Sequence, residues 1–123
     1  MTVLGVEGLT VRAAIRGMVA DHGGIPVADG VHIAWQIANG LACVHSMLDE
    51  DGQPAPMVHR DLKPANLIIS RHGLVKLVDF GLVKGKQIAF HTMVPNITRG
   101  TPSYMSPEQV MGQPLTGASD QFS

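Results

Sequence analysis

The segment His59–Asn66 reads HRDLKPAN and is the most informative part of this 123-residue chain. Two apolar runs follow it, Leu67–Ser70 and Leu74–Val78, and a short turn that contains Gly73 separates them. Two such runs with a glycine between them predict a β-hairpin. The hairpin would return the chain to its starting point, so Asp79 would lie close to the end of the HRDLKPAN segment.

Three further segments follow the hairpin in a distinctive order. Asp79–Gly81 reads DFG, Gly100–Glu108 reads GTPSYMSPE, and Asp120 lies beyond them. No apolar period holds over residues 80–102, which predicts an ordered loop or a switch segment. A DFG tripeptide alone is a weak signal, but its ordered combination with HRDLKPAN resembles the eukaryotic-type protein kinase family, and its bacterial serine/threonine members in particular.

The resemblance implies a fold of the α+β class. It would be part of a protein-kinase-like large (C-terminal) lobe, mainly helical, with a small β-hairpin that carries the catalytic and metal-binding loops. Residues 1–123 would form one partial kinase domain, truncated at both ends, in which Val3–Arg12 resembles the hinge and the last residues resemble the start of the lobe's central helix. No glycine-rich loop is found and no lysine precedes Lys63, so the small-lobe lysine of the family would be missing.

Apolar periodicity and breaker residues predict four helices. The breaker segment His22–Pro26 would close the first helix, and Asp29 would cap the second. Cys43 falls in the apolar pattern of the second helix, which predicts a buried, unreactive thiol. The four ranges are Thr10–Val19, Asp29–Leu48, Pro107–Gly112 and a helix that begins near Ser119.

The resemblance implies phosphate transfer from ATP, a reaction that depends on positioning and on neutralisation of phosphate charge. Asp61 would be the base that accepts the proton of the attacking hydroxyl, and Lys63 would place a cation on the transferred phosphate. Asn66 would belong to the catalytic set and would hold Mg²⁺ together with Asp79, because Mg²⁺ prefers oxygen ligands. Ile68 would form the floor of the adenine pocket, and Lys63 and Asp79 would also contact the nucleotide. ATP and Mg²⁺ are therefore the expected cofactors.

Substrate class and regulation are also implied by the resemblance. Lys63 together with Thr101 resembles the serine/threonine class rather than the tyrosine class. Arg60 resembles the arginine that pairs with a phosphorylated residue of the activation segment. Thr92 and Thr98 lie in the segment that would carry this phosphate. Threonine is common in loops, so phosphorylated and ordinary loop threonines both remain open at these two positions.

Several other residues match structural positions of the family. His59 and Phe80 resemble members of the apolar spine, and Glu108 and Asp120 match residues with structural roles. The other histidines show no metal-ligand spacing, which favours packing or solvent roles. These histidines are His22, His32, His45, His72 and His91.

The composition limits the partners and the compartment. Nine Lys and Arg against ten Asp and Glu make a net charge of −1, which argues against a general binder of nucleic acids or anionic membranes. The chain is 45% hydrophobic and only 15% charged, so it should fold and should carry apolar surface that needs a cover. A single cysteine, no signal-peptide pattern and no long apolar run predict a cytoplasmic chain without a membrane segment, although the parent protein could be anchored elsewhere.

The predicted function is that of a protein serine/threonine kinase fragment, whose complete domain would transfer the ATP γ-phosphate to Ser and Thr hydroxyls of protein substrates. The small lobe and the remaining large-lobe helices would come from the parent protein. Without them, Leu41, Leu62 and Val75 would be partly uncovered and the isolated chain would be inactive. Two alternatives stay open: a truncated, catalytically inactive module that binds a protein partner, and a non-functional gene fragment.

Overall fold

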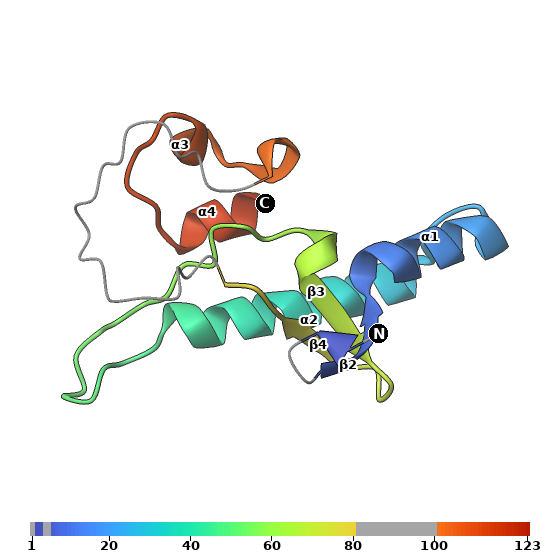
Figure 1. Ribbon diagram of the computed structural model, residues 1–123, viewed down its shortest axis with the longest axis horizontal. Helices are drawn as coiled ribbons and strands as arrows, with labels where there is room; N and C mark the ends of the chain where they lie inside the picture. Colours follow the sequence, from blue (N-terminus) through green and yellow to red (C-terminus); the bar gives the residue numbers. More distant parts are fainter. Residues whose placement is uncertain (1, 4–5, 81–100) are drawn as a thin grey trace.

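The computed structural model describes residues 2–3, 6–80 and 101–123. The two longest helices pack against a short antiparallel sheet, and the C-terminal helices lie beside the segment that follows the longest helix (Figure 1). This mixture of helices and strands is consistent with the α+β prediction. The predicted phosphorylation sites Thr92 and Thr98 lie outside the described residues.

The sheet joins two parts of the chain that are far apart in sequence. β2 pairs with β3 and β3 pairs with β4, so that Thr10 lies opposite Ile68 and Ile68 lies opposite Lys76. The predicted hairpin is confirmed, with Gly73 at a φ of +76° in its turn. The strands in spatial order are β1 (Thr2–Val3), β2 (Val6–Thr10), β3 (Leu67–Ser70) and β4 (Val75–Leu77).

The strand β2 is not predicted from the sequence. Gly8 interrupts its five-residue run, and a glycine inside a strand weakens the alternating pattern that identifies strands. The structure explains the glycine, because a Cβ atom at Gly8 would lie 2.3 Å from the carbonyl oxygen of Ile69. Gly8 therefore permits the close pairing of β2 with the hairpin.

The first helix, α1, spans Val11–His22 and confirms the first predicted helix, although it continues past Val19. Thr10 caps its start, because the Thr10 Oγ1 accepts a hydrogen bond of 3.2 Å from the N–H of Ala13. Gly23 ends it at a φ of +73°, and its N–H donates to the carbonyl oxygen of Val19 at 2.9 Å.

The long helix α2 spans Val27–His45, so it begins and ends earlier than predicted. The prediction that Asp29 caps it is wrong, because the cap residue is Pro26, which has no N–H to leave unsatisfied at the helix start. Asp29 lies in the first turn, where the helix dipole favours a carboxylate. Leu48 lies beyond the helix and forms a β-bridge with Pro54.

Two short helices follow the undescribed segment, α3 at Pro107–Val110 and α4 at Gly117–Phe122. Both begin with a capping box, at Ser106 and at Thr116, in which the cap side chain and the third helical residue exchange hydrogen bonds. The prediction for α3 extends too far, because Gly112 has a φ of +66°, outside the helical region. α4 confirms the helix predicted near Ser119.

The core is a cluster of Val11, Leu41, Leu62 and Leu67, which ties α1 and α2 to the segment that leads into β3. The prediction that Leu41 and Leu62 are partly uncovered is wrong, because packing in this cluster leaves them only 5% and 7% exposed. Val75 is half-buried beside the same cluster, as predicted.

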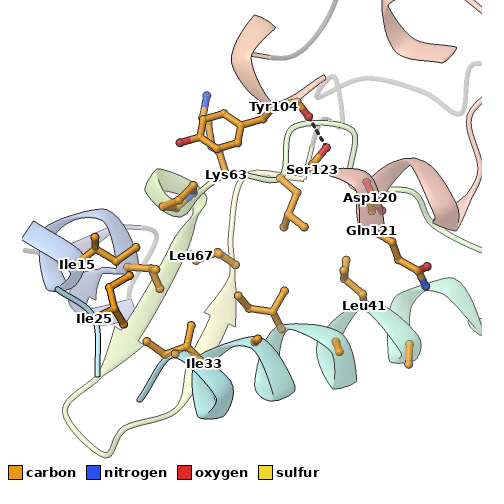
Figure 2. Close-up of a pocket in the computed structure, with 18 of the residues that line it drawn as sticks. Ile15, Ile25, Ile33, Leu41, Lys63, Leu67, Tyr104, Asp120, Gln121 and Ser123 are labelled. Atoms are coloured by element: carbon orange, nitrogen blue, oxygen red, sulfur yellow. Dashed lines mark hydrogen bonds between the residues drawn. The ribbon is translucent and has the colours of Figure 1, made fainter. Parts of the chain in front are cut away.

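A cavity of about 520 Å³ lies beside this core, between α1, α2 and α4. Figure 2 shows Ile15, Ile33 and Leu41 along its apolar wall and Lys63 and Asp120 at its edge. The open apolar space that the composition predicts is therefore found here, and the four residues of the buried cluster form part of its lining.

The outer side of α2 is also apolar. Val27, Val31 and Trp35 recur at helical spacing and are 82%, 63% and 62% exposed. Cys43 on the same helix is exposed, so the prediction of a buried thiol is wrong. Apolar residues at helical spacing indicate that one face of a helix is buried. When apolar residues occupy more than one face, the spacing does not show which face is buried. No helix in the described part of the chain is long and apolar enough to cross a membrane.

Candidate active site

The Asp61 carboxylate lies at the centre of a network formed by four predicted site residues. Lys63 Nζ lies 3.0 Å from Asp61 Oδ2, and Asn66 Nδ2 donates to the same oxygen at 3.1 Å. The other oxygen, Oδ1, accepts from both the N–H and the Oγ1 of Thr101, each at 3.1 Å. The structure therefore brings the four residues together, although Thr101 is far from the others in sequence.

The surroundings of Asp61 keep its carboxyl ionised. Partial burial raises the pKa of Asp61, but the hydrogen bond and charge of Lys63, with further hydrogen bonds from Thr101 and Asn66, outweigh burial and hold the pKa below its ordinary value. Asp61 is therefore a carboxylate at neutral pH, the form that can accept a proton.

Lys63 links the two sides of the site. Its Nζ also donates to Thr101 Oγ1 at 2.5 Å, so the ammonium bridges Thr101 and Asp61. The side chains of Lys63 and Asp61 are 24% and 28% exposed. A substrate hydroxyl or phosphate could therefore reach both groups from solvent.

Asn66 and Asp79 lie at the two ends of the hairpin. Asn66 is buried in a 3-10 helix, Pro64–Asn66, where its Nδ2 donates to the carbonyl oxygen of Asp61 at 2.8 Å. The N–H of Val78 donates to the carbonyl oxygen of Asn66 at 3.0 Å, which places the adjacent Asp79 beside it in the chain fold. Asp79 is exposed and has a φ of +55°.

These two residues fit a hard cation by the chemistry of their donor atoms. The amide oxygen of Asn66 and the carboxylate of Asp79 are oxygen ligands of the kind that Mg²⁺ takes in phosphate-binding sites. The described residues contain no cluster of three or more His, Cys, Asp or Glu that could hold a metal by themselves. A metal at this site would therefore depend on the amide of Asn66 and on the substrate phosphates as well as on Asp79.

Asp120 holds the start of the HRDLKPAN segment. Its carboxylate is 1% exposed and accepts from the backbone N–H of His59 at 2.8 Å and of Arg60 at 2.9 Å. A third donor, His45 Nε2, lies 2.8 Å from Asp120 Oδ2. The buried carboxylate is therefore satisfied by three donors, and α4 is fixed to the HRDLKPAN segment.

His59 is fully buried and connects the HRDLKPAN segment to the end of the hairpin. Its Nδ1 accepts from the N–H of Asp61 at 3.3 Å, and its Nε2 donates to the carbonyl oxygen of Val78 at 3.0 Å. Its ring packs against Phe80, with 4.6 Å between ring centroids. The two residues that resemble members of the apolar spine therefore contact each other, and their role in such a spine stays a prediction.

Glu108 connects the two C-terminal helices. The hydroxyl of Ser119 donates to Glu108 Oε1 at 2.5 Å and lowers the pKa of that carboxyl. Glu108, a residue of α3, thus contacts α4 through Ser119, and its structural role stays a prediction.

Some predicted residues have no contact that tests their role. The side chain of Arg60 is exposed and forms no ion pair with another described residue. Thr92 and Thr98 lie outside the described residues. Ile68 is 2% exposed in the middle of the sheet, and its place beneath adenine stays a prediction.

Two residues of the site are not identified from the sequence. His45 is expected to pack or to face solvent, yet it binds Asp120, which lies 75 positions away, and no local signal indicates such a partner. Gln109 Nε2 donates to the carbonyl oxygen of Arg60 at 2.6 Å. A capping-box pattern from Ser106 to Gln109 could have identified the second residue, although only as a helix cap.

The sequence of this chain is similar to those of known proteins. The family described as Protein kinase domain matches residues 6–123. Serine/threonine-protein kinase PknA of Corynebacterium glutamicum is 34% identical over 110 residues, which cover 89% of this chain and 22% of that protein. Serine/threonine-protein kinase PknL of Mycobacterium tuberculosis is 36% identical over 118 residues, 96% of this chain and 26% of that protein. Tyrosine-protein kinase MasK of Myxococcus xanthus is 31% identical over 122 residues, 99% of this chain and 18% of that protein.

The chain spans roughly a fifth to a quarter of the length of these relatives. The family match covers nearly the whole chain, including the HRDLKPAN, DFG and GTPSYMSPE segments on which the resemblance depends. HRDLKPAN and GTPSYMSPE together supply the residues of the Asp61 network, and Asp120 binds the backbone of HRDLKPAN. The chain therefore belongs to the protein kinase domain family.

Proposed function

We propose that this chain forms part of the catalytic domain of a protein serine/threonine kinase. The observation that carries the proposal is the ionised carboxylate of Asp61, which Lys63, Asn66 and Thr101 hold in place. Residues 1–123 would be the hinge and part of the large lobe, and the small lobe would come from the remainder of a longer protein. The complete domain would transfer the γ-phosphate of ATP to Ser and Thr hydroxyls of protein substrates.

Asp61 would act as the base in this transfer. The oxygen of the substrate hydroxyl forms a bond to the γ-phosphorus, and the bond from that phosphorus to the bridging oxygen breaks, so that ADP leaves. The hydroxyl proton passes to a carboxylate oxygen of Asp61. Lys63 Nζ, which now donates to Thr101, would also donate to the transferred phosphate. Its positive charge would offset the negative charge on that phosphate during the transfer.

Asn66 and Asp79 would hold Mg²⁺ through the amide oxygen and the carboxylate. When bound, the ion neutralises phosphate charge and orients the phosphate chain. Asn66 Nδ2 is already committed to Asp61, which leaves the oxygen end of the amide to face a cation. One residue would thus connect the metal site to the base.

Removal of one metal ligand gives a direct test. Asp79→Asn in the full-length protein should raise the Mg²⁺ concentration needed for half-maximal activity at least roughly tenfold, because an amide binds Mg²⁺ less strongly than a carboxylate. Initial rates over a Mg²⁺ titration measure the effect. Glu50→Gln, in the exposed loop after α2, is the control for loss of one negative charge. An unchanged Mg²⁺ requirement in Asp79→Asn would remove Asp79 from the metal site.

The acceptor is proposed to be serine or threonine because of the bond between Lys63 and Thr101, which matches the pattern of that class. Tyrosine is the second candidate, since one relative is named a tyrosine-protein kinase. Mass spectrometry of a mixed peptide library incubated with the full-length protein and Mg·ATP would identify the phosphorylated residue type. Transfer mainly to tyrosine would overturn the acceptor assignment, and no transfer to any residue would overturn the kinase proposal.

A non-catalytic binding module is not favoured as an alternative. A module that only binds a partner has no need for a low-pKa carboxylate surrounded by a lysine, an amide and a threonine hydroxyl. The same network is what phosphate transfer requires.

Activation by phosphorylation is a second testable part of the proposal. Phosphate on Thr92 or Thr98 would pair with the exposed guanidinium of Arg60, since arginine binds phosphate through two parallel hydrogen bonds. Mass spectrometry after autophosphorylation should place phosphate between Lys84 and Arg99, and Arg60→Gln should lower the activity of the phosphorylated form roughly tenfold with little effect on the unphosphorylated form. Full activity without phosphate in this window would contradict the prediction.

A further inference from the structure

The residue before the base has a strained backbone. Arg60 adopts a φ of +71°, in the left-handed region that side chains disfavour. Such a conformation persists only where neighbouring groups fix it. Two groups do so here: Asp120 Oδ1 accepts from the Arg60 N–H at 2.9 Å, and Gln109 Nε2 donates to the Arg60 carbonyl oxygen at 2.6 Å.

The peptide bond between Arg60 and Asp61 is therefore held on both sides. Gln109 binds its carbonyl oxygen, and His59 Nδ1 accepts from its N–H at 3.3 Å. The orientation of this peptide plane decides where the Asp61 Cβ points. A group that fixes the plane therefore acts on the position of the Asp61 carboxylate without touching it.

The amide of Gln109 has only one orientation that satisfies its neighbours. Its Oε1 accepts from the N–H of Ser106 at 3.0 Å, and the facing carbonyl of Arg60 requires a donor. Gln109 is 8% exposed, so water cannot readily replace either partner. The capping box of α3 therefore fixes which end of the Gln109 amide faces Arg60, so that Nε2 donates the hydrogen bond to the Arg60 carbonyl oxygen.

Residues 101–109 thus hold the base at two points. Thr101 at one end binds the Asp61 carboxylate through two hydrogen bonds, and Gln109 at the other end binds the preceding carbonyl. A change in the position of this segment would move both contacts together.

We propose that Gln109 is a positioning residue for phosphate transfer, which orients the Arg60–Asp61 peptide and makes the geometry of the base depend on the segment that ends in α3. The proposal rests on the kinase function proposed above. Gln109 has no role in nucleotide binding, so its effect falls on the chemical step and not on the affinity for ATP.

The decisive variant is Gln109→Glu in the full-length protein. The introduced carboxylate can still accept from Ser106, so the capping box is kept, but at neutral pH it has no proton to donate to Arg60. We expect kcat to fall roughly tenfold to hundredfold, as small misplacement of a reacting group does, with the KM for ATP within about twofold of the wild type. Gln113→Glu, exposed beyond α3, is the matched control for the added charge.

A pH profile separates positioning from general destabilisation. Burial against a carbonyl raises the pKa of the introduced carboxyl, so it should take up a proton in mildly acidic solution and regain a donor. Asp61 stays ionised there, because its own pKa is lowered. The deficit of Gln109→Glu relative to the wild type should therefore shrink between about pH 7.5 and pH 5.5, whereas Gln109→Met, which has no donor at any pH, should show a constant deficit.

Hydrogen exchange of the Asp61 amide provides a readout that does not need activity. Loss of the Gln109 bond should accelerate this exchange about tenfold or more in both Gln109 variants and leave it unchanged in Gln113→Glu. A wild-type protein that transfers no phosphate would overturn the kinase proposal. Faster exchange of the Asp61 amide in the variants would still support the orientation of the Arg60–Asp61 peptide by Gln109. Wild-type kcat in the Gln109 variants, a pH-independent deficit in Gln109→Glu, or unchanged exchange would each overturn the role of Gln109.

Discussion

Replacement of Asp61 by asparagine in the full-length protein is expected to lower kcat for phosphate transfer roughly 10²- to 10⁴-fold. The amide has nearly the shape of the carboxylate but cannot take up the proton of the substrate hydroxyl. It also has only one acceptor atom, whereas Thr101 now donates to Oδ1 and both Lys63 and Asn66 donate to Oδ2. The KM for ATP should change far less, because the proposed role of Asp61 is toward the hydroxyl and not the nucleotide.

Steady-state rates with Mg·ATP and a serine peptide measure this effect. Asp51→Asn is a matched control, since Asp51 is exposed in the loop after α2 and the same charge is lost. Because the pKa of Asp61 is lowered, the wild-type rate should hold from neutral into mildly acidic solution and decline only when Asp61 itself takes up a proton. An Asp61→Asn enzyme as fast as the Asp51 control would exclude Asp61 as the base.

The HRDLKPAN segment and the hairpin could be predicted because their signals are local. The residue types of HRDLKPAN and their order are enough to identify that segment, and two apolar runs with Gly73 between them are enough to predict the hairpin. The closure of the hairpin then follows from geometry, which is why Asn66 and Asp79 were expected at one place. The three residues that contact the Asp61 carboxylate extend this reasoning, with Thr101 supplied by the resemblance.

Contacts across the chain could not be predicted in this way. Asp120 and its partner His45 are 75 positions apart, and each alone has the ordinary signals of a short helix and a helix end. The role of Gln109 likewise becomes visible only in its hydrogen bond to the Arg60 carbonyl oxygen, which the sequence does not indicate. β2 becomes a strand because β3 is present to pair with it, since its own run is interrupted by Gly8.

The apolar excess of the composition was predicted correctly, but not its location. Leu41 and Leu62 are buried because they pack in one cluster with Val11 and Leu67, a contact that no periodic pattern reveals. The exposed apolar side chains instead include Val31 and Trp35 on α2. Which face of a helix is covered depends on tertiary packing, and a helix with two apolar faces leaves that choice open.

Asp120→Asn is expected to destabilise the folded protein by roughly 3–5 kcal/mol, the largest stability effect of any single change considered. The side chain is 1% exposed, and Oδ1 and Oδ2 both accept hydrogen bonds, from Arg60 on one side and from His59 and His45 on the other. An asparagine must direct its NH₂ group toward one of these sides. In either orientation a buried donor faces another donor and loses its partner.

In Asp120→Asn we expect stability and activity to fall together. If the NH₂ group faces Arg60, the strained φ of +71° loses one of its two supports and the adjacent base is released. Thermal unfolding and kcat of the same preparations measure both effects, with Asp21→Asn, an exposed change in α1, as the control. His45→Gln should cost much less, because a glutamine amide can still donate to Asp120 and the two backbone donors remain. Equal losses for Asp120→Asn and His45→Gln would show that the backbone N–H groups of the catalytic segment do not depend on this carboxylate.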